Sequence, residues 1–542
     1  MSNHKHKSRT IKHIEQQAKK GDLLAIHTLA NSYSTGKYLE KIDLNKAEHY
    51  LKELANALIS APFLLQSLEL NEFRRFKKLT VEFDQQLTVF IGNNGAGKTS
   101  IIDSICKVLS WFTNNLIRQD VNGKRINELD IHVDCDEFSS IISKFTLGDK
   151  TKIEVNLGTS VSGYANKITN QGPQARQTGQ IYRTVANQIM LPIFACYTVE
   201  RANVAISKSV KENPLIPTRN NRFNVYKDSL EASAHLQSFS DDYVKLANLA
   251  TGETSKEITE LEHTIEVLSS AIAIINKDKK SSVSDALLIE REQALQSLAA
   301  LKSTLPTQHQ QQLSTINQTI ERFLPEVKNL RIDRNKDGQT RILADNFGNE
   351  INITQLSQGQ KSLLALVGDL ALRLIKLNPL SDEPLNANGI VLIDEIELHL
   401  HPQWQQQILK SLTERFPKIQ FIVTTHSPQV LSTVDKSSIR QLCSDHHSQP
   451  IIVIPSYQTQ GVTSASILAQ LMETHAIPQD IPQAIWVREF TQFIAEGNIT
   501  KADQHLIKIS KHFGENHPVT LDCQEQLKVY QLKQKYLIQG SK

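Results

Sequence analysis

The chain has 542 residues and a formal net charge of +3, with 39% hydrophobic and 22% charged residues. This composition excludes a wholly disordered or fibrous chain, and the small net charge excludes a globally polycationic nucleic-acid binder, so any such contact needs a local basic face. The N-terminal residues are basic without an apolar core, and no run of about 18 apolar residues occurs, so we expect a cytoplasmic protein without membrane contact.

Helices are predicted at the N-terminus, before the first strands. Residues 10–58 space their apolar side chains as a pair of amphipathic helices does, with a break at 33–36. Two interpretations of this pair stay open: a single repeat similar to Sel1 repeats, or a helical cap packed on the main domain. Residues 65–83 alternate polar and apolar side chains as two paired strands do, and 87–91 form an apolar run typical of a buried strand.

A glycine-rich turn follows this buried strand and precedes an apolar helix. Glycines in such a turn let backbone N–H groups converge on a phosphate, and the helix directs its positive N-terminus at the same anion. Lys98 would place its charge between the β- and γ-phosphates of ATP, and Thr99 would offer its hydroxyl to Mg²⁺. The turn consists of Gly92, Asn93, Asn94, Gly95, Ala96, Gly97, Lys98, Thr99 and Ser100.

A pair of acidic residues ends a second buried strand. Residues 389–393 are apolar, as parallel strands covered on both faces are, and Asp394 and Glu395 follow directly. At this strand end Asp394 would reach the Mg²⁺, and Glu395 would polarise the attacking water as a general base.

Two further segments of the sequence could contact the γ-phosphate of ATP. Ser357, Gly359 and Gln360 stand at the start of an apolar helix, where free N–H groups and the serine hydroxyl would form a second anion site. Two anion sites for one γ-phosphate make sense only if they come from different subunits; the alternative is an ordinary serine-capped helix. A third apolar strand, 421–425, leads to His426, which is either a γ-phosphate sensor or a structural histidine.

In chain order, these motifs resemble those of ABC-type ATPases, in the branch of SMC, RecF and overcoming-lysogenization ATPases rather than transporters. Residues 70–76 and 395–404 are also similar to that branch, although Gln358 stands where transporters carry glycine. The resemblance implies an α/β P-loop ATPase head, ATP and Mg²⁺ as cofactors, and a homodimer or higher oligomer formed through the heads. It also implies an interfacial arginine, for which Arg201 is the candidate; a surface ion pair is the alternative.

A helical insertion is predicted inside this head. Residues 258–275 space Ile and Leu alternately by three and four, as a coiled-coil seam does, and a second helix follows at 286–302. We expect a short hairpin that ends at Pro306; two ordinary core helices are the alternative. The expected parts are a helical Sel1-like cap (1–60), an N-terminal ATPase lobe (61–250), the hairpin insertion (251–325), a C-terminal ATPase lobe (326–445) and a mostly helical partner-binding region (446–542).

The sequence after His426 contains no Asp-x-Asp cluster and no His-Asn-His zinc pattern, so cutting of nucleic acid would belong to a partner. A helical N-terminus, an ATPase with a short insertion and a helical C-terminus without a nuclease are together similar to PtuA-type ATPases of Septu antiphage systems, above all their retron-associated form. That resemblance implies a partner HNH nuclease of the PtuB type and, in retrons, a reverse transcriptase bearing a branched RNA–DNA molecule. We therefore expect a slow, regulated ATPase that gates the nuclease.

Other functions stay open at this point. They are an SMC- or RecF-like DNA repair ATPase, whose arms are usually far longer, a transporter ATPase, which needs a transmembrane partner, and a nucleotide-gated scaffold with negligible turnover. For DNA or another nucleic acid, the candidate surface is the basic group Arg74, Arg75, Lys77 and Lys78. The alternative is an ordinary solvated strand.

Overall fold

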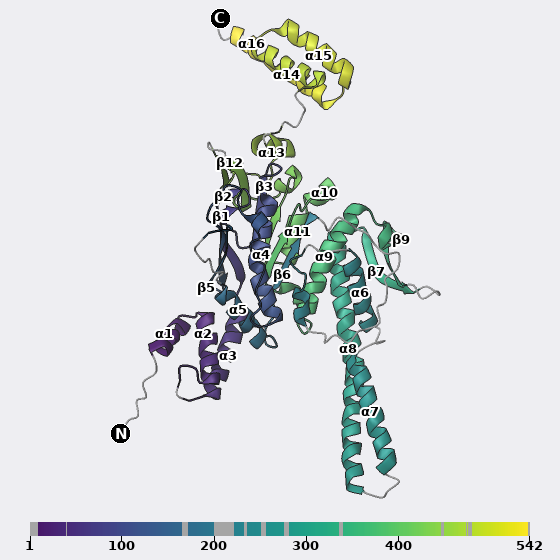
Figure 1. Ribbon diagram of the computed structural model, residues 1–542. Coiled ribbons are helices and arrows are strands. Elements are labelled where there is room, and N and C mark those ends of the chain that lie inside the picture. Colours follow the sequence, from purple (N-terminus) through teal and green to yellow (C-terminus); the bar gives the residue numbers. More distant parts are fainter. Residues whose placement is uncertain are drawn as a thin grey trace. The chain divides into compact units, whose positions relative to one another are not determined.

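The computed structural model describes residues 9–39, 41–164, 172–199, 222–231, 236–250, 256–275, 281–334, 340–445, 449–472, 474 and 480–539. The chain divides into two compact units, Met1–Gly461 and Val462–Lys542. Figure 1 shows the elements of both units. Among the described residues, no helix is both long enough and apolar enough to cross a membrane.

A six-stranded sheet forms the centre of the first unit, and all its strands except the edge strand β13 run parallel. Every residue of β6, β10 and β11 is buried, as expected for parallel strands covered on both faces. The strands predicted before the glycine-rich turn, the acidic pair and the histidine are confirmed. In spatial order they are β13 (Pro450–Val453), β12 (Ile439–Ser444), β3 (Leu87–Gly92), β11 (Ile419–Thr424), β10 (Gly389–Ile393) and β6 (Ile193–Tyr197).

A four-stranded antiparallel sheet is joined to the first sheet through helix α4 (Lys98–Ile117). Phe112 of α4 lies 5.2 Å from Phe63 of β1, and Phe63 lies 5.3 Å from Phe194 of β6, measured between ring centroids. This aromatic cluster fixes the helix that follows the phosphate loop against both sheets. The strands are β2 (Phe76–Glu82), β1 (Phe63–Phe73), β4 (Phe138–Leu147) and β5 (Thr151–Ser160), in that spatial order.

Three N-terminal helices, α1 (Arg9–Lys19), α2 (Leu23–Thr35) and α3 (Leu44–Ile59), precede the sheets. Gly36 ends α2 with φ +77°, which confirms the predicted break. The Leu23 amide donates to Thr151 Oγ1 at 2.8 Å, and Gln177 of α5 (Pro173–Thr184) donates to the Leu24 carbonyl at 2.7 Å. These bonds favour the interpretation of the helices as a cap on the main domain.

The helical insertion is longer than predicted. α7 (Lys256–Ile275) packs along α8 (Ser281–Phe323), and Figure 1 shows the two side by side. α8 continues through Pro306, so the prediction that the hairpin ends there was wrong. Proline removes one helical hydrogen bond, but Ile316 and Ile320 are fully buried where α8 packs on α6 (Leu236–Ala250) and on α9 (Gln358–Leu377). This packing stabilises the continuation.

The remaining elements of the first unit include α9, which begins directly after Ser357 and is called the signature helix from here on. A three-stranded antiparallel sheet precedes α9, and three short helices follow β10 and β11. They are β7 (Val327–Arg334), β8 (Thr340–Asn346), β9 (Asn349–Asn352), α9 (Gln358–Leu377), α10 (Pro402–Gln405), α11 (Ile408–Arg415) and α12 (Pro428–Leu431).

The second unit is helical, as predicted. Gly497, with φ +74°, separates α14 from α15, and 514–517 separate α15 from α16. Phe490, Ile509 and Cys523 form its small core. The helices are α13 (Ser464–Leu471), α14 (Pro482–Ala495), α15 (Ile499–Phe513) and α16 (Pro518–Gln539).

Candidate active site

The glycine-rich turn connects the end of β3 to the start of α4, as predicted. Gly97 caps α4 with φ +103°, a conformation that side chains with a Cβ rarely adopt. A Cβ at this position would lie 2.4 Å from Cζ of Phe76, the first residue of β2. Glycine is therefore required here on two grounds, the backbone conformation and the close approach of Phe76.

Lys98 is buried, with 6% of its surface exposed. Its ammonium group donates to the carbonyls of Gly92 and Asn93 at 2.9 and 3.2 Å, within the turn itself. Burial lowers the pKa of Lys98, and the carboxylates of Asp394, Glu395 and Glu397 oppose that shift. The lysine thus lies in a pocket whose negative charge comes from the segment after β10.

Thr99 and Asp394 are brought together although they are far apart in the sequence. Thr99 Oγ1 donates to Asp394 Oδ2 at 2.9 Å, and Thr424 Oγ1 donates to Asp394 Oδ1 at 2.5 Å. Hydroxyl and carboxylate oxygens are ligands that suit Mg²⁺, which usually keeps several waters besides one or two carboxylates. The residues present therefore fit a magnesium ion.

Glu395 and His426 lie close to Lys98, Thr99 and Asp394 and complete the candidate site. Glu395 has a left-handed backbone with φ +49°, and its amide donates to Thr424 Oγ1 at 2.8 Å. Burial lowers the pKa of His426, as does the nearby charge of Lys98, while the carboxylates after β10 oppose the shift. His426 therefore lies within electrostatic range of Lys98 and both acidic residues.

Ser357, Gly359 and Gln360 lie at the start of α9 and contact a different set of residues. Ser357 Oγ accepts from the Gln360 amide at 3.3 Å, and Gln360 Oε1 accepts from the Ser357 amide at 3.1 Å. This reciprocal capping box is the ordinary serine cap that the sequence left open, and it occupies Gln360. A Cβ on Gly359 would lie 2.4 Å from the His399 carbonyl oxygen, so the start of α9 packs directly on the segment after Glu395. Arg201 lies outside the described residues.

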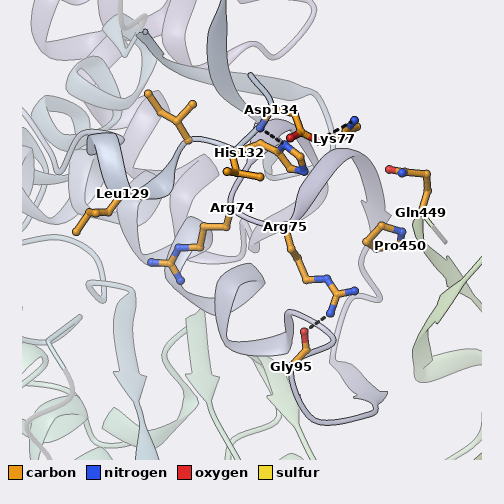
Figure 2. Close-up of a pocket in the computed structure, with 11 residues that line it drawn as sticks. Arg74, Arg75, Lys77, Gly95, Leu129, His132, Asp134, Gln449 and Pro450 are labelled. Atoms are coloured by element: carbon orange, nitrogen blue, oxygen red, sulfur yellow. Dashed lines mark hydrogen bonds and ion pairs between the residues drawn. The ribbon is translucent and has the colours of Figure 1, made fainter. Parts of the chain in front are cut away.

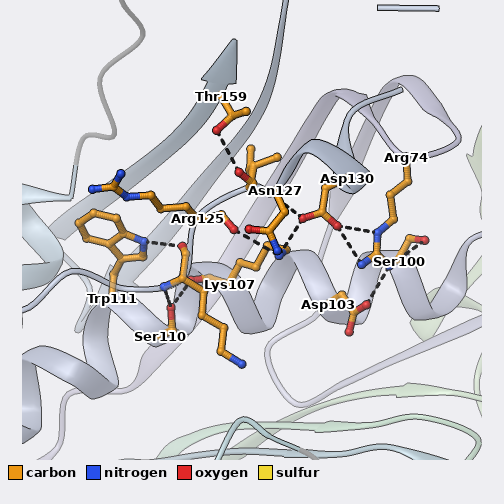
Figure 3. A network of polar contacts seen from close by, with 12 residues as sticks. Arg74, Ser100, Asp103, Lys107, Ser110, Trp111, Arg125, Asn127, Asp130 and Thr159 are labelled. Carbon is orange, nitrogen blue, oxygen red and sulfur yellow. Dashed lines mark hydrogen bonds and ion pairs between the residues drawn. The ribbon is translucent and has the colours of Figure 1, made fainter. Parts of the chain in front are cut away.

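Arg74, predicted as part of a nucleic-acid surface, belongs to a partly buried ionic network (Figure 3). Asp130 accepts from Arg74 Nε at 3.0 Å and from the Asn127 amide at 2.9 Å, and Lys107 of α4 lies 2.8 Å away. Arg74 also donates to Asp103 at 2.8 Å. The network ties loop 118–137 to the β1–β2 turn and to the helix that follows the phosphate loop.

Replacing Asp130 by asparagine should lower the free energy of unfolding by about 3 kcal/mol, because removing one partner of a buried ion pair costs about 3–5 kcal/mol and Arg74 is partly exposed. Denaturant unfolding of both proteins measures this. Burial alone would raise the pKa of Asp130, but hydrogen bonds from Lys107, Asn127 and Arg74 outweigh it and hold this pKa below its usual value. The carboxylate therefore stabilises the fold above pH ~4, and this contribution is lost as the pH falls through the lowered folded-state pKa.

The matched control for this variant is Asp103→Asn. Asp103 contacts the same arginine, but its side chain is 38% exposed, so its loss should cost less than about 1 kcal/mol. Equal unfolding curves for Asp130→Asn and the parent at pH 7 would contradict the assigned role of the network.

A cavity of about 590 Å³ opens beside the phosphate loop (Figure 2). Gly95 and His132 line it, Arg75 donates to the Gly95 carbonyl, and Lys77 lies 3.3 Å from Asp134. Arg75 and Lys77, like Arg74, therefore have partners within the protein, and the contact of this surface with nucleic acid stays a prediction. Gly95 belongs to both the cavity and the phosphate loop, so the two are continuous.

Two residues of the site were not predicted from the sequence. Thr424 bonds Asp394 and the Glu395 amide, and Glu397 bonds the strand end that carries His426. The signal for Thr424 was its position at the end of an apolar strand. Glu397 had no local signal, because its partners lie on another strand.

A phosphate loop between a buried strand and a helix, with an aspartate and a glutamate at the end of a parallel strand that is separated from it by one strand of the same sheet, defines a P-loop ATPase of the ABC type. The chain belongs to the AAA ATPase domain family, whose model matches residues 64–431. It is therefore a nucleotide-binding ATPase.

Individual relatives agree with this assignment. The "Retron Ec83 probable ATPase" of Escherichia coli is 28% identical over 520 residues, 93% of this chain and 94% of that protein. The Septu protein PtuA of Bacillus mycoides (strain KBAB4) is 45% identical over 76 residues, 14% of this chain and 10% of that protein. These relatives confirm the resemblance predicted from the sequence. Among solved structures, the Smc head domain bound to the C-terminal domain of ScpA from Pyrococcus furiosus aligns with a TM-score of 0.42 and 16% identity, over 72% of this chain and 96% of that chain.

Proposed function

We propose that this chain binds ATP with Mg²⁺ and hydrolyses it as the sensor subunit of an antiphage defence complex, in which the nucleotide state controls a partner HNH nuclease. The observation that carries the ATPase part is the convergence of Lys98, Thr99, Asp394, Glu395 and His426 from three elements onto one place. No other group of described residues combines a phosphate loop with acidic residues in this way.

Each residue of this site has a definite task in the proposed reaction. Lys98 exchanges the carbonyls of Gly92 and Asn93 for phosphate oxygens, and the N–H groups of the loop and of α4 bind the β-phosphate. Mg²⁺ held by Thr99 and Asp394 would neutralise charge on the β- and γ-phosphates. Glu395 accepts a proton from the attacking water. The cavity continuous with Gly95 offers room for the nucleoside part of the nucleotide.

The defence part of the proposal is supported by the names of the relatives, which belong to retron and Septu systems. Because nuclease motifs are missing from the sequence, we propose that an HNH nuclease partner cuts, and that a reverse transcriptase with its branched RNA–DNA molecule is a further partner. Sequencing the genes beside this one tests the proposal. Neighbouring HNH nuclease and reverse transcriptase genes would support it, and recombination or repair genes in their place would support the repair alternative.

We further propose that the start of α9 completes the site of a second subunit. A mixture of Lys98→Ala and Ser357→Arg subunits should regain ATPase activity, although each variant alone is inactive, because a mixed dimer then contains about one intact composite site. The measurement is ATP turnover of co-purified mixed dimers carrying two different tags. Mixed dimers that form but show no turnover would count against a site shared between subunits.

A further inference from the structure

Glu397 binds the strand end that carries His426. One carboxylate oxygen, Oε2, accepts from Thr425 Oγ1 at 2.7 Å, and the other, Oε1, accepts from the backbone amide of His426 at 2.6 Å. Both distances are short, as charge-assisted hydrogen bonds are. The side chain of Glu397 thus holds both Thr425 and His426, the proposed γ-phosphate sensor.

The backbone around Glu397 explains how its carboxylate reaches across to β11. Glu395 adopts φ +49°, and the Ile396 amide donates to the Thr424 carbonyl at 3.0 Å, so the chain leaves β10 in a turn that stays beside β11. The Leu400 amide then donates to the Glu397 carbonyl at 2.8 Å, which closes a second turn. Glu397 is consequently fixed at both its backbone and its side chain.

The same segment also contacts the signature helix. His399, with φ +62°, places its carbonyl oxygen where a Cβ on Gly359 would be only 2.4 Å away. At its other end, Gln405 accepts from Ser427 Oγ at 2.7 Å, one residue beyond His426. Segment 395–405 therefore touches both the start of α9 and the residues on either side of the histidine.

We propose that Glu397 is a positioning residue, which fixes the Thr425–His426 backbone so that the imidazole meets the γ-phosphate. The segment that carries Glu397 also packs on Gly359, at the start of α9. This inference rests on the proposed ATPase function of the site, whose chemistry remains with Lys98 and Glu395.

Glu397→Gln is the informative change, because glutamine keeps the shape of the side chain. Its amide has one oxygen acceptor, whereas both partners, the Thr425 hydroxyl and the His426 N–H, are donors in this structure. The Thr425 hydroxyl must therefore turn its proton away and accept from the glutamine NH₂ group, and both bonds lose the charge assistance of the carboxylate. We expect kcat to fall about 10- to 100-fold, the range for a misplaced catalytic group, while the Kd for ATP changes less than about threefold.

The experiment compares steady-state ATPase kinetics of the full-length parent, Glu397→Gln, His426→Ala and the double variant. If Glu397 acts through His426, the double variant should be no slower than His426→Ala alone. The matched control is Glu414→Gln, which removes an exposed carboxylate on α11 and should keep the parental kcat. A double variant whose loss is the product of the two single losses, an unchanged kcat in Glu397→Gln, or a change confined to KM would each overturn the proposal.

A second pair of variants keeps the test valid if Glu397→Gln does not fold. Thr425→Val removes one donor to Glu397 without changing the size of a fully buried side chain, whereas Thr425→Ser keeps the hydroxyl. We expect a fall in kcat of about 3- to 10-fold for valine and recovery with serine, since the charge-assisted bond to Glu397 and the bond from the Ser427 amide are lost together and regained together. Equal kcat values for the two variants would overturn the proposal. Lys98→Ala separates this inference from the proposed function: parental turnover in that variant refutes the site itself.

Discussion

Replacing Lys98 by alanine should abolish measurable ATP turnover and weaken ATP binding by roughly 100-fold or more. The lysine is the cation that the phosphate loop directs at the β- and γ-phosphates, and each charge-assisted hydrogen bond lost there costs about 1.5–3 kcal/mol. Its ammonium is already buried beside Asp394 and Glu395, and burial lowers its pKa. Removing it leaves these carboxylates facing the phosphates without compensation.

Isothermal titration with ATP and a phosphate-release assay measure the two effects. Lys78→Ala is the matched control, because Lys78 is an exposed lysine on β2 and its removal should leave both quantities unchanged. Lys98→Ala with parental ATPase activity would refute the assignment of the phosphate loop.

Replacing Glu395 by glutamine should slow hydrolysis by roughly 10²–10⁴-fold, the usual contribution of a positioned general base, and should leave ATP binding intact. Glutamine has the same shape and preserves the backbone bond from residue 395 to Thr424 Oγ1. Because it cannot accept the proton of the attacking water, the nucleotide stays unhydrolysed. We therefore expect this variant to accumulate as an ATP-bound dimer of heads.

Single-turnover kinetics and size-exclusion chromatography with and without ATP test both expectations. The control is Glu82→Gln, which removes the same charge at an exposed position of β2. Hydrolysis at the parental rate would show that another group acts as the base, and slow hydrolysis without ATP-dependent dimers would contradict the closure of two heads.

The elements that form the site could be predicted from local sequence patterns alone. The apolar runs before Gly92, Asp394 and His426 are buried parallel strands because only strands covered on both faces are apolar throughout. The glycine pattern between a strand and a helix specifies a phosphate loop by itself, since its geometry depends on backbone conformation within nine residues.

Local patterns failed where packing outweighs propensity or where one interpretation needs a distant partner. Pro306 signals a helix end, yet α8 continues, because its last turns are buried against α6 and α9. Arg74 looked like an exposed basic residue, but Asp130, more than fifty positions further along, takes up its charge. Gln360 caps its own helix, and its contact with nucleotide stays a prediction that needs a second subunit.

By itself, the sequence determined the class of protein, the phosphate loop and the identity of the acidic pair, because each depends on residues that are neighbours in the chain. Only the tertiary structure decided which polar groups form hydrogen bonds with one another. They are Thr99 with Asp394, Arg74 with Asp130, and the His426 amide with Glu397. Electrostatic and hydrogen-bond partners are set by distances of about 3 Å between side chains from separate strands and loops, and such distances exist only after the two sheets and the signature helix have packed together.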